Sequence, residues 1–86
     1  MVIKKSDNRR EPFDRDKLER SIQLATRKRA VSQNVIEDMV NEIEENGLML
    51  GRESHEVHSY QLGKMILDKL YDLDRVAYIR FASVYR

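Results

Sequence analysis

An α+β domain, with helices packed beside a small three-stranded sheet, is predicted by three features of this 86-residue sequence. A turn-forming stretch between two short apolar runs at the N-terminus indicates a β-hairpin. Apolar residues then recur at helical spacing in three later segments, residues 18–25, 35–43 and 62–70. A short polar segment, residues 52–58, lies before the third of these and is typical of a strand or an extended connector. The length suits one small domain.

The hairpin is expected between Val2-Ile3 and Pro12-Phe13. Ser6-Asp7-Asn8 lies between them, and these residue types favour turns because their side chains bond nearby backbone and tolerate left-handed conformations. Asp14 follows, and its carboxylate is a suitable N-cap for a first helix. The hairpin and the start of this helix therefore form one compact unit.

The first helix is predicted from Leu18, Ile22 and Ala25, and it runs into the basic triplet Arg27-Lys28-Arg29. Cations are favourable at a helix C-terminus, so we assign the triplet to that end of the helix. A nucleic-acid contact is the weaker alternative, because no aromatic residues are interleaved with the basic ones.

Ser32 is expected to cap a second helix that ends near Leu50. One face of this helix is apolar and the other acidic, which is the pattern of a helix packed on a core. The apolar stripe comprises Val35, Ile36, Met39, Val40 and Ile43.

Arg52 to His58 is interpreted as a short third strand that joins the hairpin. His55 and His58 could share a metal ion, but no zincin pattern or further ligand cluster accompanies them, so we predict no metal site. Ser59 is expected to cap the third helix. Gly63 lies inside that helix, where glycine is unfavourable, so it either permits a close approach or is simply tolerated.

The last segment begins at Asp74, which is expected to cap it, and from Val76 to Tyr85 only Arg80 and Ser83 are clearly polar. A segment that is apolar nearly all round belongs in the centre of a core or at an interface. Its β-branched and aromatic residues also suit a strand, and periodicity alone leaves helix and strand open.

Composition excludes several classes of function. The chain has no cysteine, which rules out disulfides, thiolate catalysis and cysteine-based zinc sites within it, and the net charge of +1 gives no general attraction to nucleic acid or membranes. No apolar stretch approaches the roughly 20 residues that span a bilayer, and the polar N-terminus does not resemble a signal peptide, so we expect a cytoplasmic protein without a membrane partner. Neither a P-loop nor a catalytic triad signature is present, so we expect no enzyme.

A phosphate site remains compatible with the residues. Lys4, Lys5 and Lys17 supply positive charge near the start of the first helix, whose free N–H groups favour anions. Three lysines near one end of a charge-rich domain are equally typical of an ordinary solvated surface. The residues alone leave both interpretations open.

Two stretches resemble a known family. The run Val2-x-Lys4-Lys5, followed by Glu11-Pro12-Phe13-Asp14-x-x-Lys17-Leu18, resembles the opening of the ATP-cone, the nucleotide-sensing domain of ribonucleotide reductases and of the bacterial repressor of their genes. The closing run from Asp74 to Arg86 resembles that domain in the repressor specifically. The resemblance covers residues 1–86 as a single ATP-cone domain, and it implies a four-helix bundle capped by the three-stranded sheet, with the last segment helical.

The resemblance also implies a nucleotide site. In it, the first strand lines the adenine pocket and offers backbone hydrogen bonds, the following lysines meet the phosphates, and two acidic residues read the adenine amino group. Two further residues complete the ribose and base environment, a histidine lies beside the ribose and phosphates, and a tyrosine closes the base side. The matching residues are Val2 and Ile3 in the first strand, Lys4 and Lys5 for the phosphates, Glu11 and Asp14 for the adenine amino group, Lys17 and Leu18 for the ribose and base environment, His58 beside the ribose and phosphates, and Tyr85 on the base side.

Two departures from the family pattern affect this mapping. Lys5 stands where the family commonly has arginine, so the planar fork that binds phosphate in a bidentate manner is lost. The turn Ser6-Asp7-Asn8 lacks the usual glycine and is one residue longer.

The function implied is a domain that senses ATP and dATP, with or without magnesium, and converts their binding into a change of homo-oligomeric state. In the repressors DNA is bound by a zinc ribbon with four cysteines, which this chain lacks, so we expect it to be one domain of a longer protein and not to bind operator DNA alone. One alternative is the N-terminal allosteric domain of a ribonucleotide reductase. Another is a helical interaction domain without a ligand.

Overall fold

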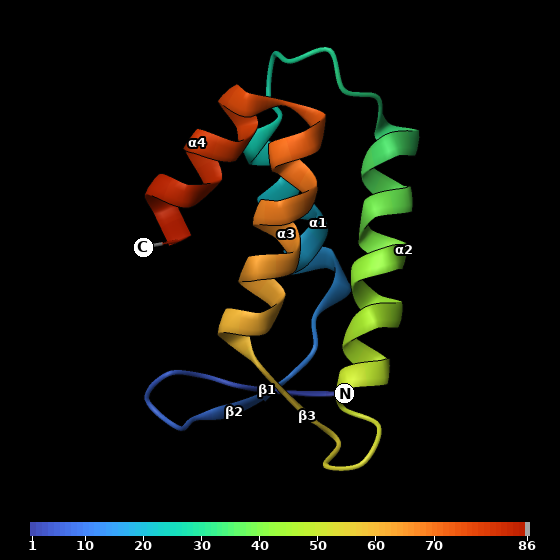
Figure 1. Cartoon of the computed structure of the whole chain (residues 1–86), viewed down its shortest axis with the longest axis vertical. Helices are drawn as coiled ribbons and strands as arrows, with labels where there is room; N and C mark the ends of the chain where they lie inside the picture. Colours follow the sequence, from blue (N-terminus) through green and yellow to red (C-terminus); the bar gives the residue numbers. More distant parts are fainter. Residues whose placement is uncertain (86) are drawn as a thin grey trace.

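The computed structural model describes residues 1–85, which form four helices and a three-stranded sheet, so the α+β prediction is confirmed. The helices are α1 (Arg15–Ala25), α2 (Gln33–Leu50), α3 (Ser59–Leu73) and α4 (Arg75–Tyr85). Figure 1 shows the sheet at one end of the molecule, with α1, α2 and α3 rising from it side by side. Arg86, the final residue of the closing run, lies outside the described residues.

The sheet has the order β2-β1-β3, with β1 (Val2–Lys4) in the centre. β2 (Arg10–Pro12) pairs with β1 antiparallel, as the predicted hairpin requires, and Asn8 in its turn has the left-handed φ of 69°. β3 (Glu56–His58) pairs with β1 in parallel, so the prediction that the third strand joins the hairpin is also confirmed. A parallel pair needs a long crossover, which here is formed by α1 and α2.

Side chains cap three of the helices as the sequence predicts. The carboxylate of Asp14 accepts a hydrogen bond from the Lys17 N–H at 3.1 Å, and the Ser32 hydroxyl accepts one from the Val35 N–H at 3.2 Å. Asp74 accepts one from the Ala77 N–H at 2.9 Å. The prediction for Ser59 is wrong by one position, because Ser59 is the first residue of α3 and His58 occupies the N-cap.

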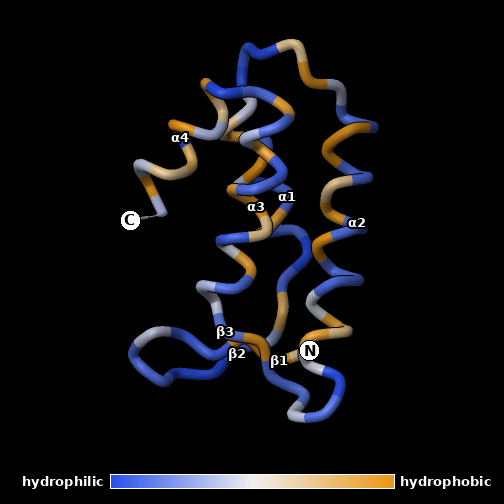
Figure 2. Tube along the Cα trace, in the orientation of Figure 1, coloured by the Kyte–Doolittle hydropathy of each residue, from blue (hydrophilic) through white to orange (hydrophobic). Residues whose placement is uncertain are grey.

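The core lies between the helices, and Figure 2 shows the apolar positions of α2 recurring on the side that faces α1 and α3. Ile22, Val40, Ile43 and Leu70 are fully buried there, as their helical spacing predicts. Val35, which the sequence predicts in the same stripe, lies in the first turn of α2 and is 39% exposed.

The basic triplet lies beyond the last turn of α1, so the prediction that its side chains belong to that end of the helix is wrong. The helix ends at Ala25 with Thr26 as its C-cap, and the Arg29 guanidinium instead pairs with Asp74 at 2.9 Å. The carbonyls of Ala25 and Arg27 receive hydrogen bonds from Arg80 of α4, at 3.3 and 2.7 Å. A cation does stabilise this helix end, but it comes from a distant part of the chain.

The final segment is helical, as the resemblance implies. Of its two predicted places, the centre of the core is wrong, and a place at an interface stays a prediction. α4 lies against α3 and α1 on the outside of the bundle, so only one of its faces is covered. Ala77 is its one fully buried residue among those described, whereas Ile79 is 61% and Val84 87% exposed. Within residues 1–85, none of the helices combines the length and the apolar character that crossing a bilayer demands.

Candidate functional site: a basic and aromatic cleft

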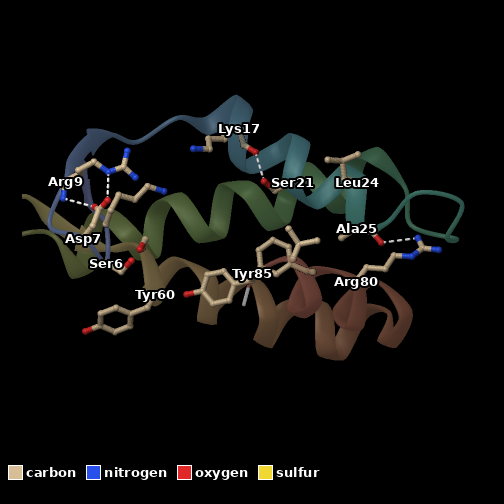
Figure 3. A pocket seen from close by; sticks show the side chains of 14 residues that line it. Ser6, Asp7, Arg9, Lys17, Ser21, Leu24, Ala25, Tyr60, Arg80 and Tyr85 are labelled. Atoms are coloured by element: carbon tan, nitrogen blue, oxygen red, sulfur yellow. Dashed lines mark hydrogen bonds and ion pairs between the residues drawn. The ribbon is translucent and has the colours of Figure 1, made fainter.

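A cleft of about 790 Å³ opens between the hairpin turn, α1, the start of α3 and α4. Figure 3 shows hairpin side chains at one end, Leu24 of α1 and Arg80 of α4 at the other, and Tyr85 between them. The volume lies within the range of about 300–1,000 Å³ that is typical of small-molecule sites. The lining residues are Lys5, Ser6, Asp7, Arg9, Lys17, Ser21, Leu24, Ala25, Ser59, Tyr60, Arg80, Phe81, Val84 and Tyr85.

Positive charge gathers at the hairpin end of the cleft. The ammonium groups of Lys5 and Lys17 lie 3.3 and 3.6 Å from the same carboxylate oxygen of Glu11. The hydrogen bond from Lys5 lowers the pKa of Glu11 below its usual value, and Lys17 adds to the effect. A single carboxylate thus holds together two ammonium groups that would otherwise repel each other, and the cluster keeps a net positive charge.

A second ion pair lies in the hairpin turn. The carboxylate of Asp7 accepts hydrogen bonds from the Arg9 backbone N–H at 3.1 Å and from its guanidinium at 2.7 Å. These two bonds, the backbone one first, lower the pKa of Asp7. The positive charge of Arg9 is therefore largely balanced within the turn, and Lys5 and Lys17 are the better candidates for binding an anion.

The other part of the cleft is apolar and aromatic. The rings of Phe81 and Tyr85 stack with their centroids 5.9 Å apart and an angle of 17° between their planes. Leu24 on α1 and Val84 on α4 line the same part, and both are largely exposed. Such surfaces suit a flat ring system, which would cover apolar area that is now in contact with water.

The structure brings some of the predicted site residues to the cleft. Lys5, Lys17 and Tyr85 line it, and Glu11 contacts both lysines. His58 does not line the cleft, but its ring stacks on that of Tyr60, which does, at 5.1 Å between centroids.

The remaining predicted residues do not line the cleft. Ile3 and Leu18 are buried in the interior, and Asp14 caps α1. Val2 donates its backbone N–H to the His55 carbonyl at 3.2 Å, so a hydrogen bond from this N–H to a base would require that bond to open. Lys4 lies in the central strand and pairs in register with Arg10 and His58.

Sequence reasoning missed several lining residues, including Ser21, Tyr60, Arg80 and Phe81. One signal was present for Arg80, because a single arginine in an otherwise apolar segment calls for a specific partner. The others have ordinary positions in amphipathic helices, and only the packing of α4 beside α1 brings them to the cleft.

No metal centre is evident in the part of the chain that the structure describes, since no three His, Cys, Asp or Glu side chains gather there. The chemistry available in the cleft includes ammonium and guanidinium groups, one carboxylate, hydroxyl groups and aromatic rings. This combination suits the binding of a small anion attached to a flat ring.

A small helical domain with such a cleft beside its sheet has the features of a ligand-binding module. The family model described as "ATP cone domain" matches residues 1–86, and the chain belongs to this ATP-cone family. The fold and the resemblance predicted from the sequence are thereby confirmed.

Curated relatives align with this chain over its whole length. It is 55% identical over 86 residues to the transcriptional repressor NrdR of Treponema denticola, 51% to that of Dictyoglomus thermophilum and 49% to that of Novosphingobium aromaticivorans. All 86 residues are covered in each comparison, but only 53–56% of the relative, so the chain spans about half the length of these repressors. The relatives are named as transcriptional repressors, which agrees with the prediction that the chain is not an enzyme.

Proposed function

We propose that this chain is the ATP- and dATP-sensing domain of a transcriptional repressor of ribonucleotide reductase genes, and that nucleotide binding controls its oligomeric state. The observation that carries the proposal is a cleft with two clustered lysines at one end and stacked aromatic rings further along, in a chain of the ATP-cone family. The resemblance of its sequence to the repressor form of the domain supports the regulatory context.

The cleft suggests how a nucleotide would lie. Phosphate oxygens would take the place of the Glu11 carboxylate beside Lys5 and Lys17, because a triphosphate carries more negative charge than one carboxylate. The base would lie toward the rings of Phe81 and Tyr85, where it covers apolar surface. Magnesium would be held by the phosphates rather than by a protein cluster.

Switching requires more than recognition of adenine. ATP and dATP share the base and phosphates and differ only at the ribose. They can favour different assemblies only if the assembly states make different contacts with the ribose. Candidate contacts between copies are the exposed apolar residues of α4, Val76, Ile79 and Val84. DNA binding would depend on a part of the repressor outside these 86 residues.

The test is the thermal midpoint of unfolding of the 86-residue chain without ligand and with ATP, dATP or GTP. A ligand at about 100 times its dissociation constant stabilises a protein by about 2.7 kcal/mol, which raises the midpoint of so small a domain by roughly 10 °C or more. We expect such a rise with ATP and dATP and a much smaller one with GTP. The double substitution Lys5→Ala with Lys17→Ala should abolish it.

The matched control is Arg20→Ala with Arg27→Ala, which also removes two positive charges but leaves the cleft lining intact. We expect this control to keep the full response to ATP. An absent response in the parent chain at millimolar nucleotide would refute the proposal and favour an interaction domain without a ligand. Sedimentation velocity with ATP and with dATP then tests the oligomeric part, which requires different distributions with the two ligands.

A further inference from the structure

Gly63 lies in the interior of α3, buried beneath the ring of Tyr85. A β-carbon built at Gly63 would lie 2.1, 2.3 and 2.4 Å from Cζ, Cε1 and the hydroxyl oxygen of Tyr85. These separations are far below van der Waals contact, so no side chain at position 63 is compatible with the observed place of the ring. Glycine is unfavourable inside a helix, and the approach of the tyrosine gives this one a physical reason.

The Tyr85 ring has cavities on two sides. It lines the basic and aromatic cleft, and it also lines a second groove between α3 and α4, which contains Tyr60, Tyr71 and Tyr78 as well. Figure 3 shows its hydroxyl directed toward the side of Tyr60. The ring is thus a wall shared by the cleft and the groove, and its position determines the width of both.

The ring of Tyr85 is partly exposed to solvent. Phe81 stacks on it from one turn earlier in α4, but Tyr85 is still 40% exposed and ends the helix. A side chain at a helix end can rotate into solvent at low cost. A methyl group at position 63 would therefore move the ring out of the cleft rather than disrupt the core.

We infer that Gly63 is a positioning residue for the ligand site, which acts by admitting the Tyr85 ring against the backbone of α3 and so fixes the aromatic wall of the cleft. This inference rests on the proposed function, because it assigns the ligand of the cleft as an adenine nucleotide. It adds a residue that makes no contact with the ligand itself.

The experiment is a double-mutant cycle on the 86-residue chain, with the dissociation constant of ATP in the presence of magnesium measured by calorimetry. Gly63→Ala and Tyr85→Ala should each weaken binding about tenfold, the effect expected for loss of one aromatic contact. The double variant should bind as weakly as Tyr85→Ala alone, because Gly63 acts only through the ring. The urea midpoint of Gly63→Ala should not fall.

The matched control is Gly47→Ala, which also adds a methyl group to a buried helical glycine. Its new β-carbon would press on the flexible end of Met1, with the sulfur at 2.9 Å, and would make an ordinary contact with Leu62 Cδ2 at 3.5 Å. Gly47 lies in α2 and outside the cleft lining. ATP affinity should stay within twofold of the parent. A nuclear Overhauser effect between the Tyr85 ring protons and the Gly63 α-protons, present in the parent chain, checks the packing independently of any nucleotide.

The possible failures are distinguishable. If the parent chain does not bind ATP, the proposed function is wrong, and the assignment of the ligand falls with it. If the parent binds ATP and Gly63→Ala binds equally well, or if the two substitutions weaken binding additively, the positioning role alone is overturned. Absence of the Overhauser effect would overturn the packing on which that role depends.

Discussion

Replacing Arg80 with methionine should loosen α4 from the end of α1. The substitution keeps most of the apolar stem and removes the guanidinium, whose Nη1 donates to the carbonyls of Arg27 at 2.7 Å and Ala25 at 3.3 Å. Ala25 is the last residue of α1, so its carbonyl has no partner within the helix and depends on an outside donor. Arg27 lies just beyond the C-cap Thr26, and its carbonyl accepts from the same guanidinium. The variant leaves these two acceptors without their donor.

The magnitude follows from the exposure of the two bonds. A hydrogen bond from a charged donor contributes about 1.5–3 kcal/mol when its loss leaves a buried group unpaired. The bond to Arg27 is exposed, so water replaces the donor there, whereas the longer bond to Ala25 is partly buried. We therefore expect a loss of about 1–2 kcal/mol in the free energy of unfolding, or roughly 4–16 °C in the thermal midpoint.

The assay is urea unfolding followed by circular dichroism, with the slope against urea compared between variants so that a change in midpoint reports stability. Arg20→Met is the control, since Arg20 is an exposed arginine of α1 outside the cleft lining. It should unfold within about 0.5 kcal/mol of the parent, as surface substitutions usually do. Equal stability of the Arg80 and Arg20 variants would refute the argument that α4 caps α1.

Two further predictions concern carboxylates. The pKa of Asp74 is lowered from its ordinary value of 3.8, first by the hydrogen bond from the Ala77 N–H and then by Arg29. The ionised carboxylate therefore stabilises the fold above pH 3.8, and this stabilisation is lost as the pH falls through the lower pKa of the folded state. The urea midpoint of the parent chain should therefore drop between pH 5 and pH 2.5. The Asp74→Asn variant should have a lower midpoint at pH 7, because the pair with Arg29 is already lost, and a smaller drop on acidification. Parallel pH profiles of the two proteins would contradict this reasoning. If the Glu11 carboxylate accepts a hydrogen bond from the adenine amino group, Glu11→Gln should reduce the preference for ATP over GTP measured by calorimetry. Tighter binding of both nucleotides with an unchanged preference would instead show that Glu11 only balances the charges of Lys5 and Lys17.

Much of this fold could be predicted from the sequence, because it depends on interactions between residues close together in the chain. Asp14, Ser32 and Asp74 could be identified as caps because a capping side chain bonds a backbone N–H only three residues away. The hairpin followed from a short turn between apolar pairs, and the faces of α1, α2 and α3 followed from the helical period. For the candidate site, the lysines near the hairpin could be recognised as a group because the same hairpin and helix start carry them.

The other features could not be predicted from the sequence, because they depend on interactions between residues far apart in the chain. The composition of α4 predicted a place in the core or at an interface, and its packing on one side of α3 and α1 leaves Ile79 and Val84 exposed. The end of α1 is capped by Arg80 rather than by the basic residues that follow it, since an exposed arginine is free to pair with whichever element lies beside it. The reason for Gly63 is likewise a ring 22 residues later, which no periodicity could place against it.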